Sequence, residues 1–346
     1  MEQPPIHNQA GDPADIPLQM PTPEETPPVD APPVHPPPFV EVQNLWVRYG
    51  QFTAVRGVTF NIPRGEVFGF IGPNGAGKTS TIKVMATLLK PTGGYVRVNG
   101  IDVATMPQRV RKRIGYVPDS FGVYEDLTVK EYLHFFAAAY KIDPGKREGI
   151  VGDVLSLTDL SHKLDSQVDS LSRGMKQRLS IARVLLHDPD LLLLDEPASG
   201  LDPRARIEMR ELLKELKKMG KTILISSHIL HELAQFCTRI GIIEAGQMVA
   251  EGSLQELYRK LGMMRIIHAQ VTNLQDGMVD KIRAIRGVIQ IEQQIDRLSI
   301  QAREEELPPE ELLAKLHALG ARVYMFQPEA MDMETAFMKL TEGKTA

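Results

Sequence analysis

The sequence predicts an α/β fold, and three observations support this class. A short apolar run at 67–71 leads into a glycine-rich segment and then into a helical pattern, which is the order strand, loop, helix. Two more apolar runs, 191–194 and 222–226, have no polar face, as expected of parallel strands covered on both sides. From residue 265 a new set of strand and helix patterns begins, so we expect a second, small α+β domain.

Length, charge and composition narrow the class of protein. A chain of 346 residues is long enough for two domains, and its net charge of -4 gives no argument for nucleic acid binding. The single cysteine excludes a disulfide framework. No apolar run approaches the ~20 residues of a membrane span, and the N-terminus lacks the basic and apolar regions of a secretory signal. We therefore expect a cytoplasmic protein, so any work at a membrane requires another subunit.

Residues 1–38 differ from the rest of the chain. They hold 13 of the 25 prolines and six acidic residues, and they contain no Lys or Arg. Such a composition cannot form helices or bury a core, so we expect a disordered, acidic, Pro-rich tail. A ligand for a proline-binding domain and a passive extension are both open interpretations, and the second is simpler.

The first folded segment is predicted to be a pair of strands. Residues 39–49 alternate apolar and polar side chains, and residues 52–62 form a second strand pattern. Tyr49 stands beside Gly50 at the turn between them. An exposed aromatic ring there could stack on a purine base, or it could simply cover the edge of a sheet, and the position alone does not decide between these.

The segment 72–80 fits the pattern G-x-x-x-x-G-K-[ST] of a phosphate-binding loop. Its residues are Gly72, Pro73, Asn74, Gly75, Ala76, Gly77, Lys78, Thr79 and Ser80. Glycines let the backbone curl so that its N–H groups point at phosphate oxygens, and the N-terminus of the following helix, expected over 80–89, adds partial positive charge. In this pattern the lysine reaches the β- and γ-phosphates and the Thr79 hydroxyl binds Mg²⁺. We therefore expect a site for the phosphates of a nucleotide with Mg²⁺.

The middle of the chain is predicted to be largely helical. A hairpin around Asn99-Gly100 and a short strand at 114–117 come first, and a helical subdomain follows over about 120–187. Within it, Ser172 and Gly174 open a helix. A serine and a glycine at a helix N-terminus could bind an anion, but on these residues alone a plain N-cap serine is the simpler interpretation.

The apolar run 191–194 ends in two carboxylates, Asp195 and Glu196, which predicts a strand tip at a nucleotide site. Asp195 would hold Mg²⁺ through water, and Glu196 would polarise the attacking water. Asp202 and the following proline are typical of the start of a helix. His228 follows the next buried strand, where its imidazole could bond the γ-phosphate.

The C-terminal part is expected to form an accessory domain over 265–346. Strands are predicted at 266–271, 288–292, 297–301 and 322–326, and helices at 274–285, 308–319 and 333–340. The order β-α-β-β-α-β is typical of a small ferredoxin-like domain.

Taken in series, these motifs give residues 39–262 a strong resemblance to the ATP-binding subunit of ABC transporters. The resemblance implies a P-loop NTPase core with an antiparallel β subdomain and a helical subdomain. It also implies that Tyr49 stacks on adenine and that Ser172 and Gly174 contact the γ-phosphate across a head-to-tail dimer, with Asp202 at that interface. In this family the catalytic set is Glu196, His228 and Lys78.

The sequences of three segments resemble those of the ATPases of ABC-2-type exporters: residues 171–178, 124–128 and 332–341. This resemblance implies a separate transmembrane permease, a homodimer or a second ATPase subunit, and a peripheral location on the cytoplasmic face of the membrane. Two residues depart from the family pattern. Asp119 replaces the expected glutamine, where its carboxylate can still ligate Mg²⁺ through oxygen, and Arg173 replaces a signature glycine.

Two other functions deserve comparison with the transporter subunit. A soluble ABC-type ATPase that acts on ribosomes or DNA is disfavoured. The chain has one nucleotide domain instead of two and no coiled-coil insertion, and outside residues 1–38 its net charge is only +2 (-4 minus -6). A nucleotide-gated module without turnover is disfavoured by the presence of both Glu196 and His228.

Overall fold

The computed structural model describes residues 37–119, 122, 126–229, 233, 236–253, 256–257, 265–272, 274, 277–303 and 306–328. Three sequence predictions lie wholly or partly outside these ranges: the Pro-rich tail up to residue 36, residues 124 and 125 of the segment 124–128, and the C-terminal segment 332–341 with its expected helix.

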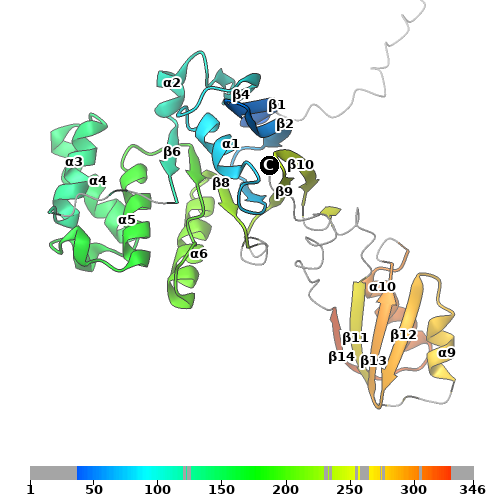
Figure 1. Ribbon diagram of the computed structural model, residues 1–346. Helices are drawn as coiled ribbons and strands as arrows, with labels where there is room; N and C mark the ends of the chain where they lie inside the picture. Colours follow the sequence, from blue (N-terminus) through cyan, green and yellow to red (C-terminus); the bar gives the residue numbers. More distant parts are fainter. Residues whose placement is uncertain are drawn as a thin grey trace, which may run out of the picture. The chain divides into compact units, whose positions relative to one another are not determined.

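A six-stranded sheet with the strand order β10-β9-β3-β8-β7-β6 forms the centre of the nucleotide-binding part (Figure 1). The strands are β3 Val67–Ile71, β6 Ile114–Val117, β7 Leu191–Leu194, β8 Thr222–Ser227, β9 Arg239–Glu244 and β10 Gln247–Gly252. All neighbouring strands are parallel except β10, which pairs antiparallel with β9 at one edge. The carboxyl ends of β3, β7 and β8 therefore meet at one edge, where ligands bind in such sheets.

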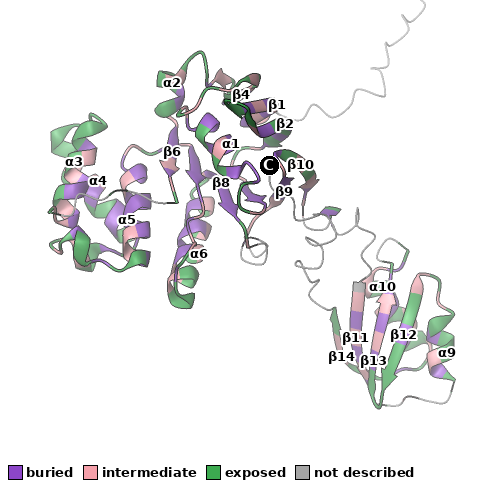
Figure 2. Cartoon of the chain, viewed as in Figure 1, coloured by how far each residue is buried: buried purple, intermediate pink, exposed green. Residues whose placement is uncertain are grey.

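The central strands are apolar because side chains cover both of their faces. Every residue of β3, β7 and β8 is buried, as Figure 2 shows for the middle of the sheet. Along β7 the side chains alternate between two cores: Leu192 and Leu194 pack with the helical region, and Leu191 and Leu193 pack with the second sheet. This two-sided covering confirms the predicted parallel strands.

A second, antiparallel sheet has the order β2-β1-β4-β5. Its strands are β1 Val40–Tyr49, β2 Phe52–Ile62, β4 Gly93–Val98 and β5 Ile101–Asp102, and the helices α1 Lys78–Met85 and α2 Pro107–Arg111 belong to this half of the chain. The helix expected over 80–89 was placed wrongly. It begins at Lys78 because Gly77 is its left-handed N-cap, and it ends before Thr87, whose φ of 61° cannot continue a helix.

Three helices form a group of their own: α3 Val129–Ala139, α4 Pro144–Leu157 and α5 Arg173–Leu185 (Figure 1). Short 3₁₀ turns at Ser161–Lys163 and Val168–Ser170 connect α4 to α5. α6 Pro203–Lys218 packs its apolar stripe into the same core. The buried Arg178 on α5 joins these elements, because its guanidinium donates to Thr158 O at 3.0 Å and pairs with Asp159 at 3.1 Å and with Glu208 on α6 at 3.2 Å.

The C-terminal part has its own apolar core. It contains β11 Arg265–Val271, α9 Met278–Arg283, β12 Val288–Gln294, β13 Arg297–Ala302, α10 Pro309–Ala318 and β14 Val323–Pro328. The strand order is β12-β13-β11-β14, with all neighbours antiparallel. The succession β-α-β-β-α-β agrees with the sequence prediction, although α9 is shorter than expected because Gly277, at a φ of 79°, begins it.

No helix in the described part of the chain has both the length and the apolar character that a bilayer crossing needs.

Candidate functional site

The phosphate-binding loop lies between the end of β3 and the start of α1. Two of its glycines are required by their surroundings. A Cβ on Gly72 would lie 2.2 Å from the Ile243 carbonyl oxygen, and one on Gly77 would lie 2.5 Å from the Ala54 carbonyl oxygen. Gly77 also has a φ of 102°, a conformation that other residues rarely adopt. The backbone is thus held close to its neighbours, with the N-terminus of α1 at the end of the loop.

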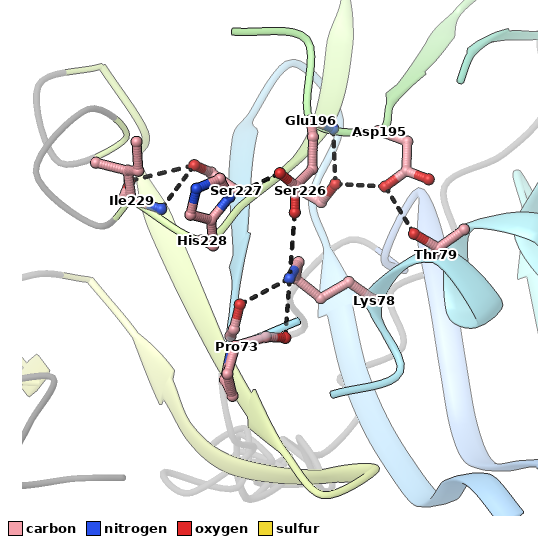
Figure 3. A network of polar contacts seen from close by, with 10 residues as sticks. Pro73, Lys78, Thr79, Asp195, Glu196, Ser226, Ser227, His228 and Ile229 are labelled. Atoms are coloured by element: carbon pink, nitrogen blue, oxygen red, sulfur yellow. Dashed lines mark hydrogen bonds and ion pairs between the residues drawn. The ribbon is translucent and has the colours of Figure 1, made fainter. Parts of the chain in front are cut away.

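Lys78 points back across the loop (Figure 3). Its side chain is only 5% exposed. Its ammonium group donates to Gly72 O at 2.7 Å and to Pro73 O at 3.1 Å, and it lies 3.3 Å from Glu196 Oε1. A buried cation with acceptors on several sides is a preformed partner for a phosphate oxygen.

Asp195, at the end of β7, is a buried carboxylate that two hydroxyl groups support. Its Oδ1 accepts from Ser226 Oγ at 2.7 Å and from Thr79 Oγ1 at 3.2 Å. Burial raises the pKa of Asp195 above its usual value. The bonds from Ser226 and Thr79 oppose that rise, and the charges of Glu196 and Asp119 add to it.

Glu196 is bound at both ends of its carboxylate. Oε1 faces Lys78, and Oε2 lies 2.7 Å from His228 Nδ1. The backbone of Glu196 is left-handed, with a φ of 48°, and its N–H donates to Ser226 Oγ at 3.0 Å. Non-glycine residues in this conformation are uncommon and need support from their surroundings. The structure therefore brings the three predicted catalytic residues together (Figure 3).

The oxygen atoms around Asp195 suit a hard divalent cation. A threonine hydroxyl and a carboxylate are ligands that Mg²⁺ accepts, and this ion is usually held by one or two carboxylates together with phosphates and water. Among the described residues, no group of three or more His, Cys, Asp or Glu side chains could hold a metal ion. Asp119 follows β6, the neighbour of β7, so its charge reaches Asp195. Burial raises the pKa of Tyr116 to about 12, and the charges of Asp195 and Asp119 add to that rise.

Beside the loop is a hollow of about 210 Å³, lined by residues 74–80 together with Tyr49, Phe52, Ala54 and Glu196. Tyr49 is 46% exposed, and its hydroxyl lies 3.3 Å from Ser80 Oγ. Phe52, which the sequence analysis missed, is 48% exposed and pairs with Tyr49 across the β1–β2 hairpin. Alternation within β2 could not have found it, because Phe52 is in phase with the buried Phe60 and Ile62. Two exposed aromatic rings beside a phosphate-binding loop can offer a base a stacking surface.

Ser172, Gly174 and Asp202 are absent from the lining of this hollow. Ser172 and Asp202 are N-caps, accepting from Met175 N at 3.3 Å and from Ala205 N at 2.9 Å. The start of α5 touches the start of α6, because a Cβ on Gly174 would lie 2.8 Å from Ala205 Cβ. Ser172 and Asp202 are exposed, and Gly174 is buried at the contact between their two helices, near the loop that contains Gly200.

Comparisons with known proteins agree with this geometry. The family model described as ABC transporter matches residues 55–199. The linearmycin resistance ATP-binding protein LnrL of Bacillus subtilis (strain 168) is 32% identical over 308 residues, covering 88% of this chain and 99% of LnrL. The Nod factor export ATP-binding protein I of Burkholderia orbicola (strain AU 1054) is 35% identical, covering 87% of this chain and 96% of that protein.

Solved structures show the same fold. One, an ATP-binding subunit of an ABC transporter, is 35% identical with a TM-score of 0.60 and covers 65% of this chain and 94% of its own. Another, a nucleotide-free ATP-binding cassette from an ABC transporter, is 25% identical with a TM-score of 0.59 and covers 65% of this chain and 95% of its own. Because the sequence likeness to the relatives spans nearly their whole length, the chain belongs to the ATP-binding subunits of ABC transporters and is an ATPase.

Proposed function

We propose that this subunit binds ATP with Mg²⁺ in the site at the carboxyl edge of the central sheet and that its hydrolysis drives export through a separate membrane permease. The observation that supports this most directly is the contact of Glu196 with both Lys78 and His228, beside Asp195 and Thr79. One cluster thus holds a phosphate-binding cation, a candidate general base and the oxygen ligands of a metal.

Each residue of the cluster has a distinct part in this proposal. The loop amides and Lys78 bind the phosphates, while Thr79 and Asp195 hold Mg²⁺, with Asp119 as a further oxygen donor. The ion supplies positive charge that offsets the charge of the β- and γ-phosphates. Tyr49 stacks on the adenine.

Glu196 is proposed to orient the attacking water and to accept its proton, while His228 holds the carboxylate through Oε2. A γ-phosphate competes with Glu196 for Lys78, because the same ammonium group serves both anions. Binding of ATP would therefore free Oε1 of Glu196 for the water. The retained bond to His228 would keep the Glu196 carboxylate oriented toward this water.

Ser172, Gly174 and Asp202 are proposed to act on the ATP of a second ATPase subunit, in a homodimer or a paired complex. Their absence from the hollow beside their own phosphate-binding loop supports this division. Two N-caps present backbone N–H groups and helix dipoles, which favour an anion. ATP would then join the two subunits.

Export by an ABC-2-type permease is supported by the relatives, several of which are Nod factor export ATP-binding proteins. We accordingly place the subunit on the cytoplasmic face of the cell membrane, with a polytopic membrane protein as its partner and no role for nucleic acid. Residues 265–346 are proposed to be an accessory domain outside the catalytic core.

The test compares Lys78→Met with Lys83→Met, because both residues lie on α1 and Lys83 is exposed. Lys78→Met should abolish MgATP hydrolysis and weaken ATP binding, while Lys83→Met should leave both at wild-type levels. Equal activity of the two variants would contradict the site. For the export role, the tagged chain should co-purify with a polytopic membrane protein from detergent-solubilised membranes of its source, and recovery with ribosomes instead would favour the alternative.

A further inference from the structure

Ser226 occupies a special place in the central sheet. It lies near the carboxyl end of β8, the strand between β3, which carries the phosphate-binding loop, and β7, which carries the two carboxylates. It pairs in register with Phe70 of β3, and the preceding Ile225 pairs with Leu194 of β7. Its side chain is fully buried. A polar side chain at 0% exposure inside an apolar strand needs hydrogen-bond partners, and those partners indicate its role.

The Ser226 hydroxyl binds both carboxylate residues at once (Figure 3). It donates its only hydrogen to Asp195 Oδ1 at 2.7 Å and accepts the N–H of Glu196 at 3.0 Å. The first bond fixes the orientation of the carboxylate proposed to hold Mg²⁺. The second fixes the peptide just before the left-handed Glu196, whose side chain reaches Lys78 and His228.

The adjacent serine differs in this respect. Ser227 is also buried, but its hydroxyl turns to the backbone of Ile229, accepting from Ile229 N at 2.9 Å and facing Ile229 O at 3.3 Å. Within the described part of the chain, its hydroxyl makes no hydrogen bond to either carboxylate residue. The two serines therefore form a natural pair in which only one has the proposed contact.

We propose that Ser226 is a positioning residue for ATP hydrolysis, holding the Mg²⁺ carboxylate Asp195 and the backbone of the catalytic Glu196 in one fixed relation. This inference rests on the proposed function of the site. Outer groups that orient a metal ligand typically contribute about 10–100-fold in metal affinity or activity. Because the Ser226 hydroxyl is engaged by Asp195 and by the N–H of Glu196, its loss should lower kcat and metal affinity while ATP binding measured without metal changes little.

The test uses Ser226→Ala, with Ser227→Ala as its matched control. Binding of Mn²⁺ in the presence of ADP, followed by electron paramagnetic resonance, gives a metal Kd without turnover. We expect Ser226→Ala to raise this Kd by about 10-fold or more and to lower kcat by a similar factor. Ser227→Ala should change the Mn²⁺ Kd less than twofold. The affinity for ADP in EDTA, measured by calorimetry, should stay near the wild-type value for both variants.

Two further variants keep the inference testable if Ser226→Ala is poorly folded. Ser226→Cys has nearly the size of serine but only a weak donor, so it should fold and lose Mn²⁺ affinity. Ser226→Thr keeps the hydroxyl and should recover most of the affinity. If a folded Ser226→Ala or Ser226→Cys binds Mn²⁺ and turns over like Ser227→Ala, the positioning role is wrong. If the wild-type protein binds no Mn²⁺ with ADP and hydrolyses no ATP, the proposed function itself fails.

Discussion

Glu196→Gln is expected to separate ATP binding from ATP hydrolysis. The Glu196 carboxylate lies 3.3 Å from the Lys78 ammonium group, and both side chains are largely buried. At an effective dielectric constant of about 20, two unit charges at this distance attract each other by about 5 kcal/mol. The desolvation of the two ions offsets most of this attraction, so we take about 1–2 kcal/mol as the net amount that ATP must overcome to engage Lys78.

The glutamine variant has no such charge, and it also lacks the repulsion between a carboxylate and the phosphates. We therefore expect ATP to bind about 5–30-fold more tightly, which corresponds to about 1–2 kcal/mol. Turnover should fall about 10²–10⁴-fold, the usual contribution of a general base. Calorimetry gives the affinity, and steady-state phosphate release gives the turnover. Glu66→Gln is the control, because Glu66 immediately precedes β3, at the opposite end of that strand from the phosphate-binding loop, and its carboxylate contacts Thr238.

Two results would refute this reasoning in different ways. Wild-type turnover in Glu196→Gln would remove Glu196 from the catalytic role. Slow turnover with ATP affinity equal to that of Glu66→Gln would show that Glu196 and ATP do not compete for Lys78. Light scattering on the same samples tests the dimer, because a slow, ATP-loaded variant should double in mass. A monomer in saturating ATP would contradict the proposed sharing of each site between two subunits.

Three more outcomes are expected. Gly72→Ala should lower the free energy of unfolding, measured by urea denaturation, by about 3 kcal/mol, the upper end of the usual cost of overpacking. The reason is that its Cβ would lie 2.2 Å from a backbone carbonyl oxygen of β9. Gly149→Ala is the control and should have no such effect, because no atom lies within 4 Å of the added Cβ. Arg178→Ala should cost about 2–3 kcal/mol in the same assay because it removes a buried cation from its partners, whereas Arg204→Ala, which is 90% exposed, should cost less than about 0.5 kcal/mol. A chain truncated after residue 262 should still bind ATP by calorimetry but should assemble or be regulated differently, and a folded truncation that binds no ATP would place the domain boundary elsewhere.

The parts of the site that the sequence predicts well are those set by local chemistry. The phosphate-binding loop is one continuous segment, and the positions of its glycines indicate where the backbone can turn sharply. Asp195, Glu196 and His228 follow apolar runs directly, and parallel strands bring their ends to one edge. The prediction that these residues meet the loop therefore needed only the strand pattern. Their roles, and those of Ser172 and Asp119, remain predictions until they are measured.

The parts that the sequence does not predict depend on contacts between distant segments. Ser226 is 31 residues from Asp195 in the sequence, and the residues 222–226 alone do not indicate which side chain its hydroxyl will bind. Phe52 lies beside the phosphate-binding loop only because the β1–β2 register pairs it with Tyr49. The end of α1 was misplaced because the apolar pattern continues to Leu89, while the left-handed Thr87 has already turned the chain.

The contact between the starts of α5 and α6 has a mechanical consequence. Gly174 leaves no room for a side chain against Ala205, and the guanidinium of Arg173 covers Gly200, whose added Cβ would lie 2.6 Å from it. The N-caps Ser172 and Asp202 therefore begin two helices that touch directly at Gly174 and Ala205. Because this contact is direct, a displacement of one helix start acts on the other, and the two caps would meet another subunit together. Enlarging Gly174 would tilt both caps together, even though neither had been changed.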